Sequence, residues 1–206
     1  WFSRYEIIHE TLMQQVSKSE IESIEDQLIR QQALDFYEED AQKIVYRTDS
    51  ETMEKRLLTL GIVIDYILTH SPEDSKPLLS RVFNEQYDKA EDGTVTVRDK
   101  KLISAKSVQN PNDPDAHYRS KAGNKVKGFS TNITETCDEE NKPNLITDVE
   151  VEGATTADNT YVESGVKGTE DVTGNKVDTL YCDGAYQSED NRKFADKQDI
   201  NLITGG

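Results

Sequence analysis

One carboxylate in this sequence stands where α/β proteins often bind ligands. Asp183 follows an apolar segment, residues 177–182, that we expect to form a strand, and it precedes Gly184. A carboxylate at the carboxyl end of a buried strand faces the crevice in which open α/β sheets place ligands, and hard divalent cations prefer such oxygen ligands. The same spacing is equally typical of an Asx turn between a strand and a helix, because a single acid does not make a metal site.

The other side chains that could do chemistry have no partner at a diagnostic spacing. The histidines, His9, His70 and His117, lie far apart, which argues against a zinc site. We interpret His9 and His70 as packing or capping residues, whereas His117 lies in a basic segment. The two cysteines, Cys137 and Cys182, cannot form a disulfide framework and fit a reducing compartment. A Gly-rich phosphate loop and a serine nucleophile elbow are both absent from the sequence.

The first 90 residues are expected to be helical. Apolar residues recur there at helical spacing, and the longest such run covers residues 57–68. The expected helix starts are capping boxes at Ser19–Glu22 and Thr48–Glu51 and a proline start at Ser71–Pro72. Long helices joined by short connections predict an antiparallel helical subdomain over residues 1–90.

The remainder of the sequence has a different character. Residues 91–125 predict a basic loop or linker with a short strand, and residues 126–206 predict the main α/β part. In that part we expect strands at 126–137, 145–151, 177–182 and 200–204, with helices at 155–172 and 189–197. The sequence therefore predicts a mixed α/β class, with a helical subdomain ahead of a mixed sheet and its flanking helices.

Charge is distributed unevenly along the chain. The net charge is −16, so the surface as a whole should repel nucleic acid. The segment from residue 95 to residue 127 nevertheless holds eight cations and three acids. Such a local positive segment suits phosphate contact, in which neutralised phosphates release counterions. It is also explained by a solvated loop that balances neighbouring acids, and charge alone favours that simpler explanation.

The sequence predicts a cytoplasmic protein fragment. No apolar run reaches the roughly 18 residues of a membrane helix, no signal peptide opens the chain, and the mean hydropathy is −0.77. Residue 1 is Trp rather than Met, so we expect the sequence to be a piece of a longer chain.

Five short motifs point to one family. They are NDPDAHYRSK at 112–121, KGFSTN at 127–132, LITD at 145–148, ATTAD at 154–158 and YCDGAY at 181–186. In this order and spacing, residues 95–206 closely resemble the catalytic region of bacterial insertion-sequence transposases of the DDE type. More loosely, WFSRYE at residues 1–6 resembles the stretch that follows the first catalytic Asp of that family.

The resemblance implies a ribonuclease H-like fold and two-metal chemistry. In that family three acids hold two Mg²⁺ (or Mn²⁺) ions, which activate water and then a DNA 3′-hydroxyl for attack on phosphodiesters. Asp183 matches the second acid and is thus the expected catalytic residue and metal ligand. The first acid would lie just before Trp1 and the third on a helix after Gly206. The fragment is therefore expected to be inactive by itself and need not bind a metal.

The resemblance also implies partners. These are the DNA ends of an insertion element, near the bacterial nucleoid, and further copies of the chain in a transposition complex; no membrane and no small-molecule substrate is implied. The residues expected to bind DNA are His117, Arg119, Lys121, Lys125 and Lys127.

The family's strand order has a structural consequence for this sequence. The expected strands at 126–137, 145–151, 177–182 and 200–204 match the second to fifth strands of the ribonuclease H-like fold. The first strand of that fold is central, between the second and the fourth, and this sequence lacks it. We therefore expect two unpaired strand edges, which invite pairing with another segment or chain.

Two alternatives remain open. The first is a non-catalytic protein-interaction module or DNA-binding remnant, which a buried Asp183 would favour. The second is a metal-dependent nuclease of the same fold, which needs further acids beside Asp183; the candidates are Glu135, Asp148 and Asp158.

Overall fold

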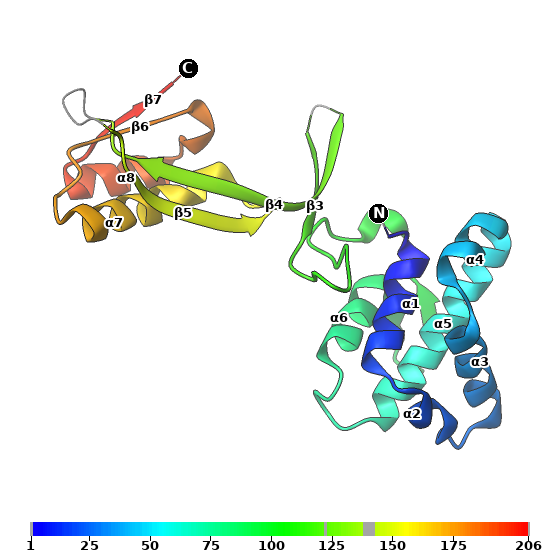
Figure 1. Ribbon diagram of the computed structural model, residues 1–206. Helices are drawn as coiled ribbons and strands as arrows, with labels where there is room; N and C mark the ends of the chain where they lie inside the picture. The colour runs from blue at the N-terminus through cyan, green and yellow to red at the C-terminus, as the bar shows by residue number, and fades with distance from the viewer. Residues whose placement is uncertain (1, 122, 138–142, 206) are drawn as a thin grey trace. The chain divides into compact units, whose positions relative to one another are not determined.

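The computed structural model describes residues 2–121, 123–137 and 143–205 and confirms the mixed α/β class. The chain divides into two compact units, residues 1–127 and residues 128–206. Helices dominate the first unit, whereas the second combines two helices with paired strands (Figure 1). The basic segment expected as a linker belongs largely to the first unit.

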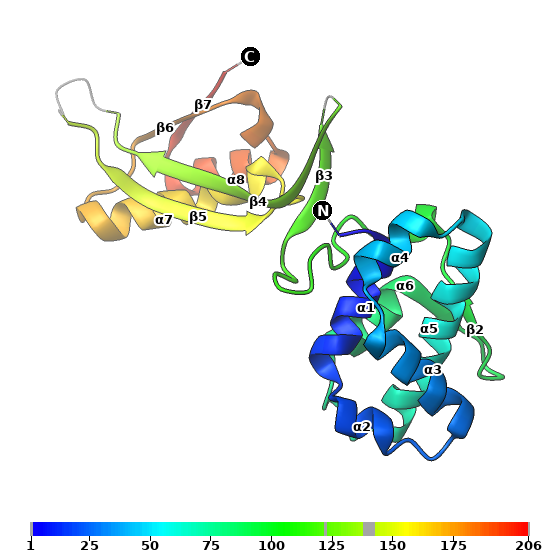
Figure 2. The same cartoon turned by 45° about the vertical axis from the view of Figure 1, so that its right-hand side comes forward.

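Six α-helices build the first unit. They are α1 (Arg4–Gln15), α2 (Lys18–Glu22), α3 (Gln27–Glu38), α4 (Ala41–Arg47), α5 (Ser50–His70) and α6 (Pro77–Gln86). The long helix α5 packs against α1, α3 and α6 (Figure 2). It is the most apolar segment of the chain, and its Leu60, Val63 and Ile64 are fully buried beside Ile8 and Leu12 of α1. The core of this unit is thus the apolar stripe that the periodicity predicts.

The helix starts differ from the predicted ones. The capping box lies at Ser17 and Glu20 rather than at Ser19–Glu22, and it begins the short helix α2. Asp49, not Thr48, caps α5 by accepting a hydrogen bond from the Thr52 amide at 3.0 Å. Neighbouring polar residues compete for the cap, and the cap is the residue whose side chain accepts a hydrogen bond from an amide of the first helical turn, as those of Ser17 and Asp49 do.

The fourth predicted helix also begins later than expected. It starts at Pro77, which takes the first helical position, and not at Pro72. The helix ends at Gln86, and Tyr87 opens β1 (Tyr87–Lys89), which pairs antiparallel with β2 (Val95–Val97). The Tyr87 ring fills the space over Gly61 of α5, where any Cβ would collide with it. Its hydroxyl donates to the Leu57 carbonyl oxygen at 2.8 Å. The β1–β2 hairpin, of which the sequence predicts only the second strand, thus covers one side of the helical core.

Residues 117–121 of the basic segment form a strand, although the sequence predicts a loop there. After the 3-10 turn η1 (Lys100–Leu102), residues His117–Lys121 form β3, which pairs with β4 (Asn124–Glu135). Along β3 and the first residues of β4, 124–127, charged residues alternate with other residues, a pattern typical of two-faced ribbons. The strand β3 carries few apolar residues, so hydrophobic alternation does not reveal it, whereas the sequence predicts most of β4.

Two pairs of strands and two α-helices form the second unit. From Phe129 onward β4 pairs antiparallel with β5 (Ile146–Gly153), and β6 (Thr179–Cys182) pairs in parallel with β7 (Asn201–Thr204). The connecting elements are η2 (Asp158–Tyr161), α7 (Val162–Thr173), η3 (Gly184–Tyr186) and α8 (Glu189–Gln198). Helix α7 packs on β5, α8 packs on β7, and the two helices contact each other (Figure 1).

Helix α7 approaches β4 and β5 closely because glycines face the strands. A Cβ on Gly165 would lie 2.6 Å from Oγ1 of Thr134, and one on Gly168 would lie 2.8 Å from a carboxylate oxygen of Asp148. Ordinary side chains do not fit at those distances. The hydroxyls of Thr147 and Thr169 add a hydrogen bond of 2.7 Å between β5 and α7. The contact therefore rests on small residues and hydrogen bonds more than on apolar burial.

Candidate functional site

Asp183 lies at the carboxyl end of β6, as the sequence predicts. It is exposed, and its Oδ1 accepts a hydrogen bond from the Ala185 amide at 2.6 Å, which caps the short turn η3. Both interpretations of the sequence thus describe the same residue: Asp183 forms an Asx turn, and that turn presents the carboxylate at the end of a strand. A buried Asp183 would have favoured the non-catalytic alternative, and the exposed carboxylate gives no such support.

A cavity of about 980 Å³ lies beside this carboxylate. Residues 132–137, which include the end of β4, line one side of it, and residues 175–183, which include β6, line the other. Side chains of α7 also line it, among them Val162, Val166 and Thr169. Asp183 itself is one of the lining residues, so the candidate acid stands at the rim of a large hollow in the second unit.

The strands on the two sides of this cavity each have an open edge. In the described part of the chain β4 pairs with β3 and β5, β6 pairs with β7 alone, and no pairing joins β4 to β6. The strand β3 is only five residues long and belongs to the start of β4, so the second half of β4 pairs with β5 only. Backbone N–H and C=O groups along these edges have no ladder partner, and such edges accept another strand.

Tyr186 connects the two sides of the cavity. Its hydroxyl donates a hydrogen bond of 2.8 Å to Oδ1 of Asn132, a buried residue of β4. Burial raises the pKa of this tyrosine, and the nearby carboxylates of Asp158 and Asp183 raise it further. The hydroxyl therefore stays protonated as a donor. Tyr186 and Asn132 belong to two of the motifs that carry the family resemblance, YCDGAY and KGFSTN, but the motifs assign no role to either side chain.

The further acids considered for a nuclease site are not assembled with Asp183. Glu135 lines the same cavity, Asp158 lies near Tyr186, and Asp148 packs under Gly168 with a buried oxygen that accepts no hydrogen bond. Among the described residues, no three His, Cys, Asp or Glu side chains come close enough to hold a metal ion.

A magnesium ion needs more ligands than Asp183 alone supplies. One oxygen of its carboxylate already accepts the Ala185 amide, which leaves the other oxygen for a metal. Mg²⁺ is held in proteins by one or two carboxylates together with waters and substrate phosphates. Asp183 fits a place in such a ligand set, but the described residues do not complete the set.

The residues expected to bind DNA occupy β3 and the start of β4. Lys121 and Lys125 are exposed, whereas His117 and Arg119 are half-buried. Strand alternation places His117, Arg119 and Lys121 on one face of β3. Elsewhere in the basic segment Arg98 is engaged in an ion pair, with its guanidinium 2.6 Å from Asp88. The freely available positive charge is therefore smaller than the sequence suggests.

Lys127 has a structural contact in the first unit. Its ammonium group donates to the Phe2 carbonyl oxygen at 3.1 Å, and partial burial lowers its pKa. It is therefore a weaker DNA candidate than Lys121 and Lys125, because binding phosphate would compete with this contact.

The remaining histidines take the packing roles predicted for them, and the cysteines are free. His9 is buried in the helical core, and His70 stacks on Tyr66 with ring centroids 4.0 Å apart. Cys137 and Cys182 are free thiols. Burial and the adjacent Asp183 raise the pKa of the Cys182 thiol, which disfavours the thiolate and hence a nucleophilic role.

Comparisons of the chain with protein-family models, curated proteins and solved structures found no significant match. Within the described ranges no helix has both the length and the apolar character that crossing a membrane requires.

Proposed function

We propose that the chain is a central fragment of a DDE-type transposase, which cuts and joins DNA phosphodiesters by two-metal chemistry. The observation that supports this most is the position of Asp183 beside the cavity between β4 and β6. An inserted strand that ran parallel to β6 would end next to Asp183. A second carboxylate at that end would then share a metal ion with it.

The size of the cavity suits one extended segment. Two segments of about six residues line it on opposite sides: residues 132–137, which include the end of β4, and residues 177–182, which include β6. A strand of that length spans about 20 Å. Its backbone would satisfy the open edges on both sides, and its side chains would alternate between α7 and the opposite face. The two pairs of strands would then join into one mixed sheet, as the family resemblance implies.

In this proposal the residues of the chain have distinct tasks. One carboxylate oxygen of Asp183 would bind a metal ion, and the other keeps the turn in place by accepting the Ala185 amide. Tyr186 holds that turn against Asn132. Bound Mg²⁺ would activate the attacking oxygen and stabilise the leaving oxygen of the phosphodiester. Lys121 and Lys125 would contact DNA phosphates, which makes binding dependent on salt.

The test is cleavage of supercoiled plasmid in Mg²⁺ or Mn²⁺. The 206-residue chain should leave the plasmid intact. The longest reading frame that contains these residues should nick it, and Asp183→Asn should abolish nicking. Asp171→Asn is the matched control, because Asp171 is an exposed acid on α7 outside the cavity lining. Nicking that survives in Asp183→Asn, or robust nicking by the 206-residue chain, would contradict the proposal.

A protein-interaction module is the second candidate, and one observation favours it. Residues 132 and 134 of β4 face α7, so the odd-numbered residues face away from it. On that face four large apolar side chains are exposed: Phe129, Ile133, Val149 and Val151. Exposed apolar groups in adjacent positions are typical of interaction surfaces. If Ile133→Ser abolished self-association measured by sedimentation while no reading frame showed nicking, this candidate would replace the first.

A further inference from the structure

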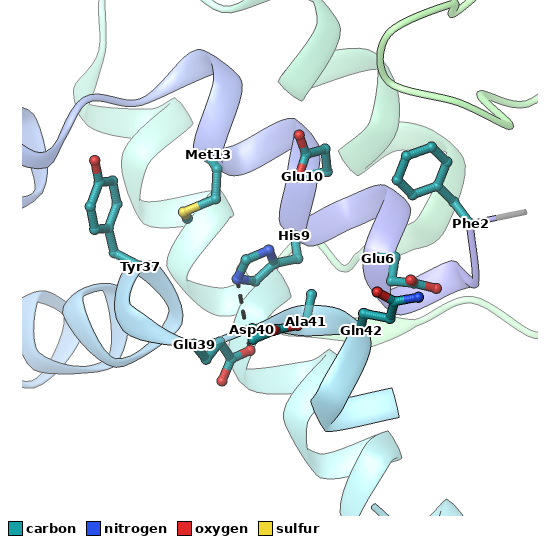
Figure 3. A pocket seen from close by; sticks show the side chains of 10 residues that line it. All are labelled: Phe2, Glu6, His9, Glu10, Met13, Tyr37, Glu39, Asp40, Ala41 and Gln42. Atoms are coloured by element: carbon teal, nitrogen blue, oxygen red, sulfur yellow. Dashed lines mark ion pairs between the residues drawn. The ribbon is translucent and has the colours of Figure 1, made fainter. Parts of the chain in front are cut away.

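A second cavity, of about 530 Å³, lies within the helical unit between α1 and the junction of α3 with α4. Figure 3 shows His9 in the middle of the side chains that line it, with Glu10 and Phe2 toward one side and Tyr37 and Glu39 toward the other. The proposed DNA chemistry makes no use of this cavity. None of the five motifs between residues 112 and 186 contributes a residue to its lining, whereas Phe2 and Glu6 of the first six residues do.

His9 presents an unsatisfied acceptor there. The side chain is 6% exposed, and its Nε2 lies 2.7 Å from the Phe36 carbonyl oxygen and 3.8 Å from a carboxylate oxygen of Glu39 (Figure 3). Both oxygens accept hydrogen bonds, so Nε2 carries a proton, and in the tautomer with a single ring proton Nδ1 is an acceptor. Nδ1 is buried and has no hydrogen-bond partner. Buried polar atoms without a partner are uncommon and call for an explanation, and a missing ligand is one of them.

The charge of the lining selects a cation. Glu6, Glu10, Glu39 and Asp40 all line the cavity. Arg56 binds Glu39, and Lys43 lies 3.0 Å from Asp40, so two of the four carboxylates are compensated. Among the described residues, Glu10 forms no ion pair, whereas Glu6 accepts the Ser3 amide at 2.7 Å and interacts electrostatically with the Lys127 ammonium group. The remaining charge is therefore negative and lies on the α1 side of the cavity, next to His9.

The apolar part of the lining sets the shape of the ligand. Phe2, Met13, Tyr37 and Ala41 contribute carbon surface to the same cavity. The Tyr37 ring already has a lysine ammonium group, that of Lys18, 5.8 Å from its centroid. Aromatic faces attract such cations. A ligand with a short alkyl chain and a terminal N–H-bearing cation matches both parts of the lining, whereas a bare metal ion does not.

We propose that this cavity binds an alkylammonium group. One N–H donates to Nδ1 of His9, the positive charge lies against Glu10 and Glu6, and the alkyl chain lies along Met13 and the aromatic rings. The group belongs either to a free primary amine or to a lysine side chain of a partner protein, since both carry the same chemistry.

The test uses n-butylammonium as the probe and the ¹⁵N and ¹³C signals of the His9 ring as the readout. A saturable shift of the Nδ1 signal is expected, with none from 1-butanol, which has the chain but no charge. Glu10→Gln should weaken binding roughly tenfold, as expected for the loss of one charge-assisted hydrogen bond. Glu22→Gln, an exposed acid of α2 outside the cavity, should leave the affinity unchanged.

A Gly-Lys-Gly peptide distinguishes the two sources. Tighter binding of the peptide than of n-butylammonium would assign the site to a partner's lysine, and weaker binding would assign it to a free amine. Equal shifts from 1-butanol and n-butylammonium, unchanged affinity in Glu10→Gln, or an Nδ1 signal that does not move would each overturn the proposal. Circular dichroism of Glu10→Gln verifies that the variant is folded. None of these outcomes bears on the nicking test.

Discussion

The hydroxyl of Tyr186 donates a hydrogen bond of 2.8 Å to Oδ1 of Asn132, so the turn that presents Asp183 is fastened to the strand across the cavity. Among the described residues, no other side-chain hydrogen bond joins the β4–β5 pair directly to β6, η3 or β7. The bond fixes the place of the carboxylate relative to the open edge of β4. It therefore connects the stability of the second unit with the geometry of its candidate site.

Removing the Tyr186 hydroxyl should destabilise the second unit. In Tyr186→Phe the buried oxygen of Asn132 loses its donor, which costs about 1–3 kcal/mol of unfolding free energy. Urea unfolding followed by circular dichroism measures the loss. Tyr181→Phe is the control, because Tyr181 is 60% exposed and its hydroxyl lies outside such a contact. Equal effects of the two substitutions would show that the bond does not hold the turn.

A methyl group at Gly165 should push α7 away from β4. The Cβ of Gly165→Ala would lie 2.6 Å from Thr134 Oγ1, and overpacking of this kind costs about 1–3 kcal/mol. Thr134→Ala removes that oxygen, so the double variant should recover much of the stability lost in the single one. Thermal unfolding of both variants measures this cycle. If the two substitutions acted additively, close packing of α7 on β4 would be ruled out as the cause.

The Glu20–Lys76 pair should make the helical unit sensitive to acid. The Lys76 ammonium group, 2.7 Å from Glu20, and then the Ser17 amide lower the pKa of Glu20 from 4.5 to about 2. A lowered carboxyl pKa stabilises the folded state above pH 4.5, and this stabilisation is lost as the pH falls toward 2. Because Glu20 is half exposed, Glu20→Gln should cost only about 1 kcal/mol at pH 7.

The pH dependence of the stability lost in Glu20→Gln tests the role of the lowered Glu20 pKa. Urea unfolding at pH 7 and at pH 2.5 should show the difference between Glu20→Gln and the unchanged protein shrinking at the lower pH. Glu22→Gln, on the same short helix, should show no such change. A difference that grew toward low pH would contradict the assigned direction of the pKa shift.

Lys121 of β3 and Lys125 of β4, the two exposed lysines expected to bind DNA, should determine DNA affinity if the proposed contact holds. Lys121→Ala and Lys125→Ala should each lower the slope of log K against log salt by about 1 for duplex DNA. Fluorescence anisotropy over a range of salt concentrations measures the slope. The control is Lys55→Ala, since Lys55 is paired with Glu51 on α5. Absence of binding at low salt, or an equal effect of Lys55→Ala, would rule out the ribbon as a DNA surface.

The sequence predicts the parts of this fold that depend on local patterns. The stripe of α5 and the glycine that ends α7, Gly174, follow from periodicity and from the left-handed conformation that glycine adopts there. The position of Asp183 after β6 is confirmed for the same reason, because an apolar segment followed by Asp-Gly is a local signal.

Long-range relationships escaped prediction. The strand β3 carries charged residues where hydrophobic alternation would be needed to recognise it. The bond from Tyr186 to Asn132 joins residues 54 positions apart, and the acceptor in the His9 cavity arises only because α1 and α3 meet. Such contacts depend on which elements pack together in three dimensions, and no local pattern in a single sequence predicts that.

Hydrogen exchange along the two open edges tests the central claim that an inserted strand completes the Asp183 site. In the 206-residue chain the amides that point to the open edges, those of Ile133 in β4 and of Thr179 and Tyr181 in β6, should exchange rapidly, because the alternate amides of each strand bond to β5 or β7. In the longest reading frame that contains it, the same amides should become protected, by roughly a hundredfold or more, while the β1–β2 hairpin stays unchanged. Exchange at these positions that is equally fast in both proteins would contradict the claim.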